Sequence, residues 1–306
     1  MKRIRQQFAD TVLAVGDDDD KLVVMVGDIS HGILQPFAKA HPDRYYNTGI
    51  LEQTLMSMAA GLARTGLYPV LHTITPFVIE RAFEQIKLDF CYQKLHGNIV
   101  TVGSAFDYAS LGCTHHCYGD FALLKTLEGV DIVYPGSAQE FDALFRQCYR
   151  NDRLTYYRIP ERSHGYGIVN PTFGVGVKYA GGDDVTIIAT GPHLRTAMDA
   201  GSMLDRQHGI SAEIIYIHTI CPLDSEMIVN SVSKTKCVIV IEEHMRSGGL
   251  TDDVLALVWP VGLIAVASIS IPGKFVRDYG TYDDHCKALG FTAENVARVA
   301  ENLCTR

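Results

Sequence analysis

The sequence predicts an α/β protein of two doubly wound domains, each with a mostly parallel sheet between layers of helices. Short apolar runs alternate with longer stretches whose apolar residues recur at helical spacing, a pattern typical of parallel sheets. Three of the apolar runs end at a glycine, namely Gly27, Gly103 and Gly191. The alternation stops between residues 159 and 182 and then restarts, which indicates two domains rather than one.

The first domain is expected to begin with an amphipathic helix, followed by a buried strand at Lys21–Val26 behind an acidic loop. A helix follows at Gly49–Thr65, where small residues make up one face, and another at Phe77–Tyr92 carries apolar residues at helical spacing. The same patterns predict strands at Tyr68–Thr73, Asn98–Gly103, Val130–Tyr134 and Thr155–Arg158, and helices at Phe121–Leu127 and Ser137–Arg150.

Residues 159–182 contain two prolines and several glycines with little periodicity, so we expect a linker at 163–182 together with an antiparallel ribbon. The first domain would then cover residues 1–162 and the second, smaller domain residues 183–306. In the second domain we expect strands at Val185–Gly191, Ser211–His218, Cys237–Glu242 and Gly262–Ser270, and helices at His193–Gly209, Asp224–Val232, Gly248–Val258 and Thr292–Cys304.

The composition is that of a soluble α/β protein rather than a nucleic-acid or membrane protein. Apolar residues make up 47% and charged residues 20% of the 306 residues, and the formal net charge is −8. That charge, without any run rich in lysine or arginine, argues against a nucleic-acid surface. No stretch of eighteen apolar residues occurs and the N-terminus lacks the apolar core of a signal peptide, so we expect neither a membrane span nor export.

The eight cysteines are scattered and lie mostly in apolar surroundings. Without an export signal, reduced thiols in the cytoplasm are expected rather than disulfides. Only Cys113-Thr-His-His-Cys117 is similar to a metal-binding cluster, and it lacks a second pair of ligands at zinc spacing. No metal site is therefore predicted on this chain.

A series of short motifs resembles the C-terminal half of the transketolase family, which includes transketolase, 1-deoxyxylulose-5-phosphate synthase and the β subunits of 2-oxoacid dehydrogenases. The motifs follow the order found in the family, and the synthase branch is the most similar. They are Pro42-Asp-Arg-Tyr-Tyr46 with Ile50-Leu-Glu-Gln53, Phe77 with Arg81-Ala-Phe-Glu-Gln85, Thr114-His115, Pro135-Gly-Ser137, Arg158-Ile-Pro160, Pro222-Leu-Asp224, and Glu242-Glu243 with Gly248-Gly249. The resemblance implies a thiamine pyrimidine-binding domain followed by the smaller transketolase C-terminal domain.

The resemblance also implies which residues bind the cofactor. Glu52 matches the buried carboxylate that hydrogen-bonds the thiamine pyrimidine and activates the cofactor. Ile50, two residues before Glu52, is a further candidate for cofactor binding. Phe77 matches the aromatic residue that stacks on the pyrimidine. Position alone would also fit a glutamate stabilised by a helix N-terminus and a phenylalanine in the core.

Further residues are implied to act on the substrate. His115 matches the histidine that faces the reacting carbonyl, where it can donate a proton or a hydrogen bond, and His116 could take that role or hold a substrate group. Arg158 matches an arginine that grips the substrate phosphate. Asp28 and His31 follow a strand, where α/β sheets place ligand sites, and are additional candidates for substrate binding.

Some positions depart from the sugar-phosphate enzymes of the family. The acidic residue before the histidine motif is Leu111 here, and a histidine that transketolases carry upstream is Gly103. In the family, both positions lie where the protein contacts the hydroxyl groups of the sugar, so the resemblance does not identify the donor or the acceptor. Asp107 and Tyr108 could supply substitute contacts. The segment before Arg81 is about one residue longer than the family pattern, so no role is carried over to Arg81.

The family also needs a domain that binds the diphosphate and magnesium, marked by Gly-Asp-Gly and a later Asn, and this sequence has no such signature. The resemblance therefore implies one subunit of a split enzyme that binds thiamine diphosphate together with a separate N-terminal subunit, which supplies the magnesium ligands. We expect two copies of each subunit, small ketose and aldose or 2-oxoacid substrates, and no nucleic-acid or membrane partner.

The expected reaction transfers a two-carbon ketol unit from a ketose or 2-oxoacid donor to an aldehyde acceptor. One alternative is the β subunit of a 2-oxoacid dehydrogenase of the pyruvate or acetoin type, which passes an acyl group to lipoamide. Those subunits usually carry His-x-His where this chain has Thr114-His-His. The other alternative is a non-catalytic assembly subunit, and the joint presence of Glu52, Phe77 and His115 argues against it.

Overall fold

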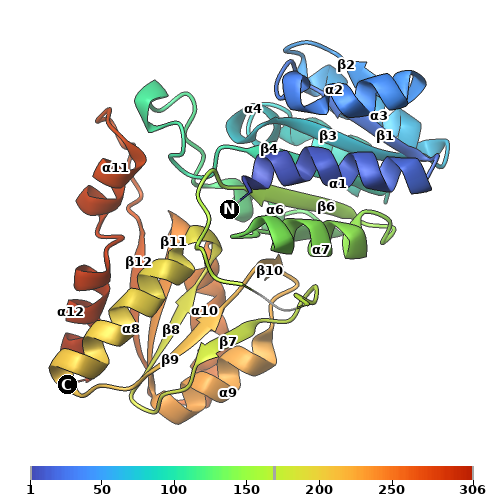
Figure 1. The fold of residues 1–306 in the computed structure, drawn as a ribbon. Coiled ribbons are helices and arrows are strands. Elements are labelled where there is room, and N and C mark those ends of the chain that lie inside the picture. The colour runs from blue at the N-terminus through green and yellow to red at the C-terminus, as the bar shows by residue number, and fades with distance from the viewer. Residues whose placement is uncertain (1, 168–169, 305–306) are drawn as a thin grey trace.

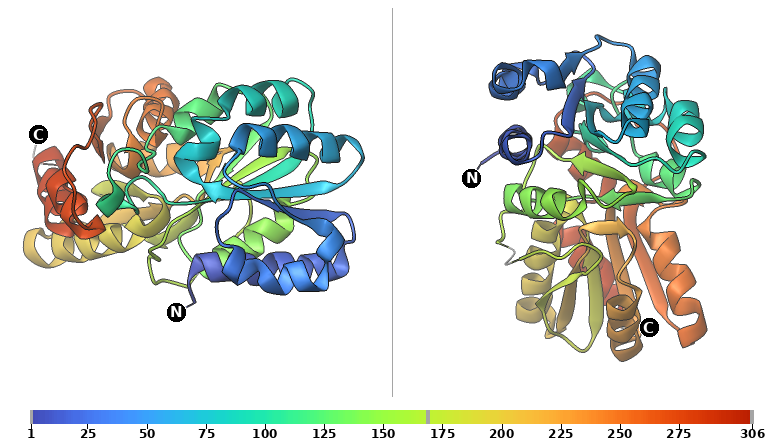
Figure 2. Two further views of the ribbon diagram at one scale, coloured as in Figure 1. Left: turned by 90° about the horizontal axis from the view of Figure 1, so that it is seen from above. Right: turned by 90° about the vertical axis from the view of Figure 1, so that its right-hand side faces the viewer.

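The computed structural model of the protein describes residues 2–167 and 170–304, which form two α/β domains (Figures 1 and 2). In Figure 1 the first domain, coloured blue to green, lies above the second, coloured yellow to red. In the right-hand view of Figure 2, helices cover both faces of each sheet. The doubly wound α/β architecture expected from the sequence is confirmed.

The first sheet has seven strands in the order β10-β5-β6-β4-β3-β1-β2. All neighbours pair in parallel except β10, which runs antiparallel to β5. The strands are β1 (Leu22–Val26), β2 (Tyr45–Asn47), β3 (Tyr68–Ile74), β4 (Gly97–Val102), β5 (Val130–Val133), β6 (Leu154–Ile159) and β10 (Thr219–Cys221). Neither β2 nor β10 was predicted, because three residues are too few to show a pattern. β10 comes from the second half of the chain, so the first sheet contains residues from both domains.

Helices α1 (Ile4–Asp18), α2 (His31–Ala40) and α7 (Ala138–Cys148) cover one face of this sheet, and α3 (Glu52–Arg64), α4 (Thr75–Ile79) and α6 (Asp120–Lys125) cover the other. Helix α7 begins where the Ser137 hydroxyl accepts a hydrogen bond from the backbone N–H of Glu140. Helix α3 buries small side chains, including Ala59, Ala60 and Ala63, against the sheet. Because these side chains are short, the helix lies close to the sheet and brings its first residue, Glu52, under the surface.

The single helix expected at Phe77–Tyr92 is wrong in detail, because the segment forms three pieces. They are α4, α5 (Phe83–Gln85) and a π-helix, η2 (Ile86–Cys91). Between α4 and α5, the backbone N–H of Arg81 bonds the carbonyl of Pro76, five residues earlier. Such wide turns accommodate an extra residue in a helix, which agrees with the longer spacing noted before Arg81.

The second sheet has five strands in the order β12-β11-β8-β9-β7, and all neighbours pair in parallel except β7, which is antiparallel to β9. The strands are β7 (Val177–Ala180), β8 (Val185–Ala189), β9 (Ala212–Tyr216), β11 (Cys237–Met245) and β12 (Ala265–Ile271). Of the antiparallel ribbon expected between residues 159 and 182, the structure describes only β7 as a strand, and residues 168–169 lie outside the described part.

Helices α8 (Leu194–His208) and α12 (Ala293–Cys304) pack on one face of the second sheet, and α9 (Ser225–Thr235) and α10 (Leu250–Val258) on the other. Helix α11 (Tyr282–Leu289) was not predicted. It begins with a capping box in which Thr281 and Asp284 bond each other's backbone N–H groups.

Buried carboxylates join the two domains. Glu243 of β11 accepts hydrogen bonds from the hydroxyls of Ser104 at 3.1 Å and Tyr134 at 3.2 Å, both in the first domain. Glu140 of α7 accepts one from the Tyr216 hydroxyl of β9 at 2.7 Å. Since separating buried polar groups from their donors is costly, the junction is expected to stay closed.

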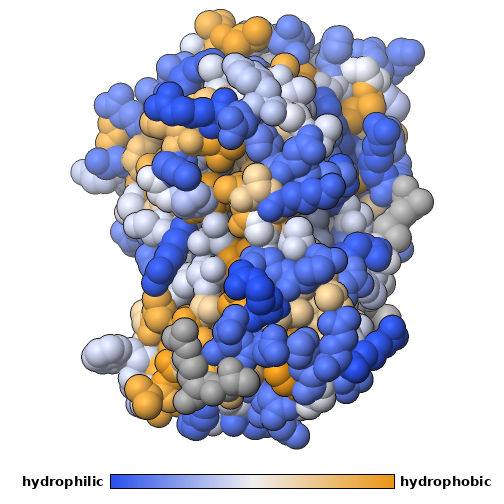
Figure 3. Space-filling view, turned by 90° about the vertical axis from the view of Figure 1, so that its left-hand side faces the viewer, coloured by the Kyte–Doolittle hydropathy of each residue, from blue (hydrophilic) through white to orange (hydrophobic). Residues whose placement is uncertain are grey.

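Apolar side chains also reach the surface. On the face of the molecule shown in Figure 3, hydrophobic residues form several groups separated by hydrophilic ones. Trp259 and Leu263, between α10 and β12, are both strongly exposed, and such neighbouring residues are candidates for contact with another molecule. Within residues 2–167 and 170–304, no helix has the length and apolarity needed to cross a membrane.

Candidate functional site

Glu52 is the first residue of α3, after a turn in which Gly49 has a φ of +72°. Its side chain is only 1% exposed. Oε2 accepts a hydrogen bond from Nη1 of Arg81 at 2.8 Å, and Oε1 is buried without a hydrogen-bond partner among the described residues. A buried oxygen without a donor is costly, so this atom fits a ligand that offers an N–H group.

Phe77 and His115 lie in the same group of side chains. The Phe77 ring, half-buried in α4, has the guanidinium carbon of Arg81 4.7 Å from its centroid. The centroid of the His115 ring is 5.2 Å from that of Phe77. The structure therefore brings together Glu52, Phe77 and His115, with Arg81 between the first two. Ile50 lies on the turn before Glu52 and is 67% exposed.

Tyr108 lies beside His115 in the loop between β4 and α6. The two ring centroids are 6.0 Å apart. A Cβ atom on Gly103 would lie 2.7 Å from the Tyr108 ring, and the φ of Gly103 is +83°. Tyr108 thus occupies the room that a larger side chain at position 103 would need. The absence of a histidine at Gly103 and the presence of Tyr108 are parts of one local arrangement.

Asp107 does not face His115. Its Oδ2 accepts hydrogen bonds from the backbone N–H and the hydroxyl of Ser104, at 2.7 and 3.0 Å, and from the N–H of Glu161 at 3.1 Å. The same Ser104 hydroxyl also contacts Glu243. Of the two substitute contacts considered from the sequence, this geometry favours Tyr108.

Asp107 should make stability depend on pH near neutrality. Burial first, and the Glu243 carboxylate second, raise its pKa from 3.8 to about 7. A raised folded-state pKa gives a stability contribution that is full below pH 4 and lost as the pH rises through 7. Between pH 5 and pH 8 the unfolding temperature of the unmodified protein should fall because of Asp107. For Asp107→Asn we expect this change to be smaller by roughly a few degrees. Thermal unfolding at several pH values checks this, and equal slopes for both proteins would contradict it.

Among the described residues, the ring of His116 contacts Tyr118 and His285, whereas it is His115 that contacts Phe77. His116 is buried, and neither ring nitrogen has a hydrogen-bond partner among the described residues. Its ring centroid is 5.7 Å from that of His285, in α11. Burial, followed by the repulsion of His285, lowers the pKa of His116 to about 4. His116 is therefore neutral at ordinary pH, and the structure does not place it with the Glu52 group.

Arg158 has a setting that the resemblance did not suggest. It is fully buried, and its guanidinium lies 3.4 Å from Asp120 and donates to the carbonyl of Glu243 at 2.9 Å. The rings of Phe121 and Tyr134 lie 4.8 and 4.9 Å from the guanidinium carbon. Its Nε and Nη1 atoms are buried without a hydrogen-bond partner among the described residues, and the phosphate-binding role implied by the resemblance stays a prediction.

Asp28 and His31 lie between β1 and the first turn of α2. Asp28 is exposed and accepts a hydrogen bond from the Asn47 side chain at 3.1 Å, and Asn47 also accepts one from the N–H of Gly49 in the turn before Glu52. His31, the first residue of α2, is exposed. Through Asn47, Asp28 is linked to the Glu52 turn, whereas within the described residues no hydrogen bond or ring contact links His31 to it.

The cysteines form neither disulfides nor a metal cluster within the described part of the chain. All eight cysteines are free, Cys113 is exposed, and the buried Cys117 thiol lies 3.5 Å from the Glu80 carboxylate. Within the described part of the chain, no group of three or more His, Cys, Asp or Glu side chains is placed to hold a metal ion.

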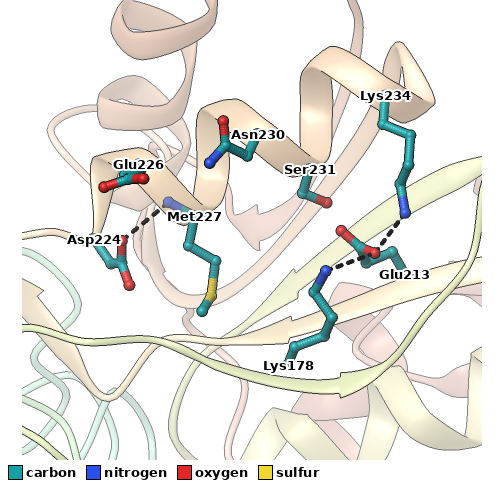
Figure 4. Close-up of a pocket in the computed structure, with 8 residues that line it drawn as sticks. All are labelled: Lys178, Glu213, Asp224, Glu226, Met227, Asn230, Ser231 and Lys234. Carbon is teal, nitrogen blue, oxygen red and sulfur yellow. Dashed lines mark hydrogen bonds and ion pairs between the residues drawn. The ribbon is translucent and has the colours of Figure 1, made fainter.

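Away from this site, a cavity of about 440 Å³ opens between β7, β9 and α9 (Figure 4). It is lined by Lys178, Glu213, Asp224, Glu226, Met227, Asn230, Ser231 and Lys234. Lys178 and Lys234 donate hydrogen bonds to Oε2 of the buried Glu213, at 3.0 and 2.6 Å (Figure 4). The cavity shares no residue with the Glu52 site, and the ion pairs give it a structural explanation.

Glu213 should protect the second domain against acid. Burial alone would raise its pKa, but hydrogen bonds from Lys234, Ser231 and Lys178 outweigh burial and lower the pKa from 4.5 to about 2. The contribution to stability is therefore present above pH 4.5 and lost as the pH falls through 2. Because the lysines are about half exposed, we expect Glu213→Gln to cost on the order of 1 kcal/mol at pH 6 and less at pH 3. Urea unfolding at both pH values measures this, and a cost that grows on acidification would contradict it.

Sequence reasoning missed one residue of the site. Arg81 touches both Glu52 and Phe77, yet the extra residue before it had argued against carrying over a role. The extra residue is the feature of the sequence that could have identified Arg81. It is accommodated in the wide turn before α5, and Arg81 contacts Glu52 from this turn.

Comparison with known proteins finds two matching family profiles. The profile of the transketolase pyrimidine binding domain matches residues 1–165, and that of the transketolase C-terminal domain matches residues 174–296. The 1-deoxy-D-xylulose-5-phosphate synthase of Heliobacterium modesticaldum is 31% identical over 97% of this chain, which spans 46% of that relative. The chain thus spans about half the length of such relatives.

Two further proteins are similar along most of their own length. One of the subunits of the apulose-4-phosphate transketolase of Phocaeicola vulgatus is 33% identical over 92% of this chain and 88% of its own. A solved split gene transketolase, described as an inactive beta4 tetramer, is 28% identical with a TM-score of 0.87, and the match covers 99% of this chain and 98% of that one. These similarities extend across both domains.

Proposed function

The chain belongs to the transketolase family, and from this premise we propose that it is one subunit of a split, thiamine diphosphate-dependent transketolase-type enzyme. The proposed reaction transfers a two-carbon ketol unit from a ketose or 2-oxoacid donor to an aldehyde acceptor. The observation that carries the proposal is the buried Glu52, which keeps one carboxylate oxygen without a partner among the described residues and is linked through Arg81 to Phe77, beside which His115 lies.

The residues present fit the pyrimidine end of thiamine diphosphate. Oε1 of Glu52 can accept a hydrogen bond from a ring nitrogen, and the Phe77 ring offers a flat apolar surface for stacking. Ile50 adds exposed apolar area on the turn. When bound, thiamine diphosphate supplies the electron sink for breaking a bond next to a carbonyl. The role of Glu52 would be to hold the pyrimidine in place by a charge-assisted hydrogen bond in a dry environment.

His115 would act on the substrate. Its Nδ1 lies 3.0 Å from the Thr114 hydroxyl. When that hydroxyl donates to Nδ1, the ring proton lies on Nε2, which can donate to an oxygen that gains negative charge during the reaction. The Tyr108 hydroxyl, next to His115, would contact a substrate hydroxyl in place of the missing family histidine. The donor and acceptor would therefore differ in this region from the usual sugar phosphates.

A separate N-terminal subunit would bind the diphosphate and the magnesium ion. Exposed apolar side chains lie on the turn before Glu52, on α3 and around η2, as expected of a surface that another chain covers. They are Ile50, Leu51, Met58, Leu88 and Tyr92, the last of which is 82% exposed. The relative named as a subunit and the solved split gene transketolase support the division between chains. We propose two copies of each subunit, and the eight free cysteines suit a reducing cytoplasm.

Calorimetry tests this proposal. Thiamine diphosphate with magnesium would be titrated into the isolated chain and into the complex of this chain with its partner, copurified from the native source. We expect weak binding by the isolated chain and tight binding by the complex. Tight binding by the isolated chain would contradict the split site, and the absence of binding by the complex would contradict the thiamine assignment.

A further inference from the structure

Arg81 contacts both groups that the proposed function assigns to the pyrimidine ring. Its Nη1 donates to Glu52 at 2.8 Å, and its guanidinium carbon lies 4.7 Å from the centroid of the Phe77 ring. A guanidinium is flat, carries several N–H donors and stacks on aromatic rings. It therefore offers Glu52 and Phe77 the same two kinds of contact as an aminopyrimidine: a hydrogen bond to the carboxylate and a stacked face.

The position of Arg81 lets it leave this place. It lies in the turn between α4 and α5, outside regular helix, and its side chain is 43% exposed, whereas that of Glu52 is 1% exposed. The contacts described for its side chain are those with Glu52 and Phe77. The guanidinium thus covers the carboxylate from the solvent side, and rotation of an exposed side chain would uncover it.

We propose that Arg81 is an internal competitor of the thiamine pyrimidine. Oε1 of Glu52 has no hydrogen-bond partner among the described residues, but the guanidinium bonds Oε2 and covers the face of Phe77 on which the ring would stack, so Arg81 must swing away before the cofactor can dock. This inference rests on the proposed function of the same site. Two consequences follow. Arg81 weakens cofactor binding, because its charge-assisted hydrogen bond and its stacking must first be broken. It also limits the rate of binding, because only the fraction of molecules with Arg81 displaced can accept the ring.

The test compares Arg81→Gln with Arg64→Gln in the complex with the partner subunit. Arg64 is the last residue of α3 and donates to Gln93 on the surface, so its replacement removes the same charge away from the site. Calorimetry with thiamine diphosphate and magnesium should give about tenfold tighter binding for Arg81→Gln, the order expected for one such charge-assisted contact. Arg64→Gln should bind like the unmodified complex.

Stopped-flow binding gives a second readout. In the unmodified complex the observed rate should reach a plateau as cofactor concentration rises, whereas in Arg81→Gln it should keep rising. Arg81→Lys keeps the charge but cannot stack as a flat group, so its affinity and binding rate should lie between those of the unmodified complex and Arg81→Gln. This variant also serves as a control for a folding defect of Arg81→Gln. If both Arg81 variants bind the cofactor as weakly as the unmodified complex, or more weakly, the proposal that Arg81 competes with the pyrimidine is wrong. Absence of binding by the unmodified complex would instead overturn the proposed function.

Discussion

Replacing Glu52 by glutamine should abolish most of the activity of the assembled enzyme while leaving the fold intact. We expect kcat to fall on the order of a hundredfold to ten-thousandfold, the range for losing a charged group that acts directly on the reacting centre. An amide of the same size can still accept a hydrogen bond, but it carries no charge and cannot favour a protonated ring nitrogen. Arg81, which donates to Glu52 at 2.8 Å, would then donate to an uncharged amide oxygen, and its own charge stays in contact with water because its side chain is 43% exposed.

A substrate-independent measurement makes this prediction sharp, because the donor and acceptor are open. The exchange of the acidic ring proton of the bound cofactor for deuterium can be followed by NMR, and Glu52→Gln should slow it by a similar factor. Glu84→Gln is the matched control, since Glu84 is an exposed glutamate in the neighbouring α5. Exchange and turnover equal to those of the unmodified enzyme would instead favour a non-catalytic assembly subunit.

The second large effect concerns stability rather than catalysis. Arg158→Met should destabilise the chain by about 3–5 kcal/mol, because it leaves the buried Asp120 carboxylate without its charge partner. Methionine has a similar length and is apolar, so the loss would come from the uncompensated charge rather than from a cavity. Denaturant unfolding followed by circular dichroism measures the change.

The double variant Arg158→Met with Asp120→Asn provides the control. Since it removes both charges, it should recover part of the lost stability, and the Tyr156 hydroxyl can still donate to the side chain at position 120. A phosphate-gripping role predicts the opposite result. Arg158→Met would then keep its stability and bind a phosphorylated substrate more weakly, with a raised KM.

The sequence predicts the long buried elements well and the short ones poorly. The strands β1, β3, β4, β8 and β11 are rich in apolar residues and buried along most of their length, so their sequences indicate buried strands. The short strands β2 and β10 depend on pairing with distant neighbours, and their sequences show no strand pattern. The break in the helix after α4 could not be predicted either, because the apolar spacing continues through it.

The candidate site follows a similar rule. Glu52, Phe77 and His115 could be picked out because short motifs surround them, and the structure places them together. The setting of Arg158 could not be predicted, since it depends on Glu243, 85 residues away in the other domain. Local sequence identifies candidate ligand-binding groups, whereas burial by a distant domain is visible only in the folded chain.

Strand β10 has a consequence for how this protein can be made and divided. The first sheet is not complete until residues 219–221 have left the ribosome, because they form its edge beside β5. During synthesis, β5 would remain an unpaired edge while the linker and the first strands of the second domain are added. A fragment cut within the linker would keep that edge exposed permanently and should aggregate. Genetic dissection or domain exchange at the linker would therefore separate the chain at a place where the fold is continuous.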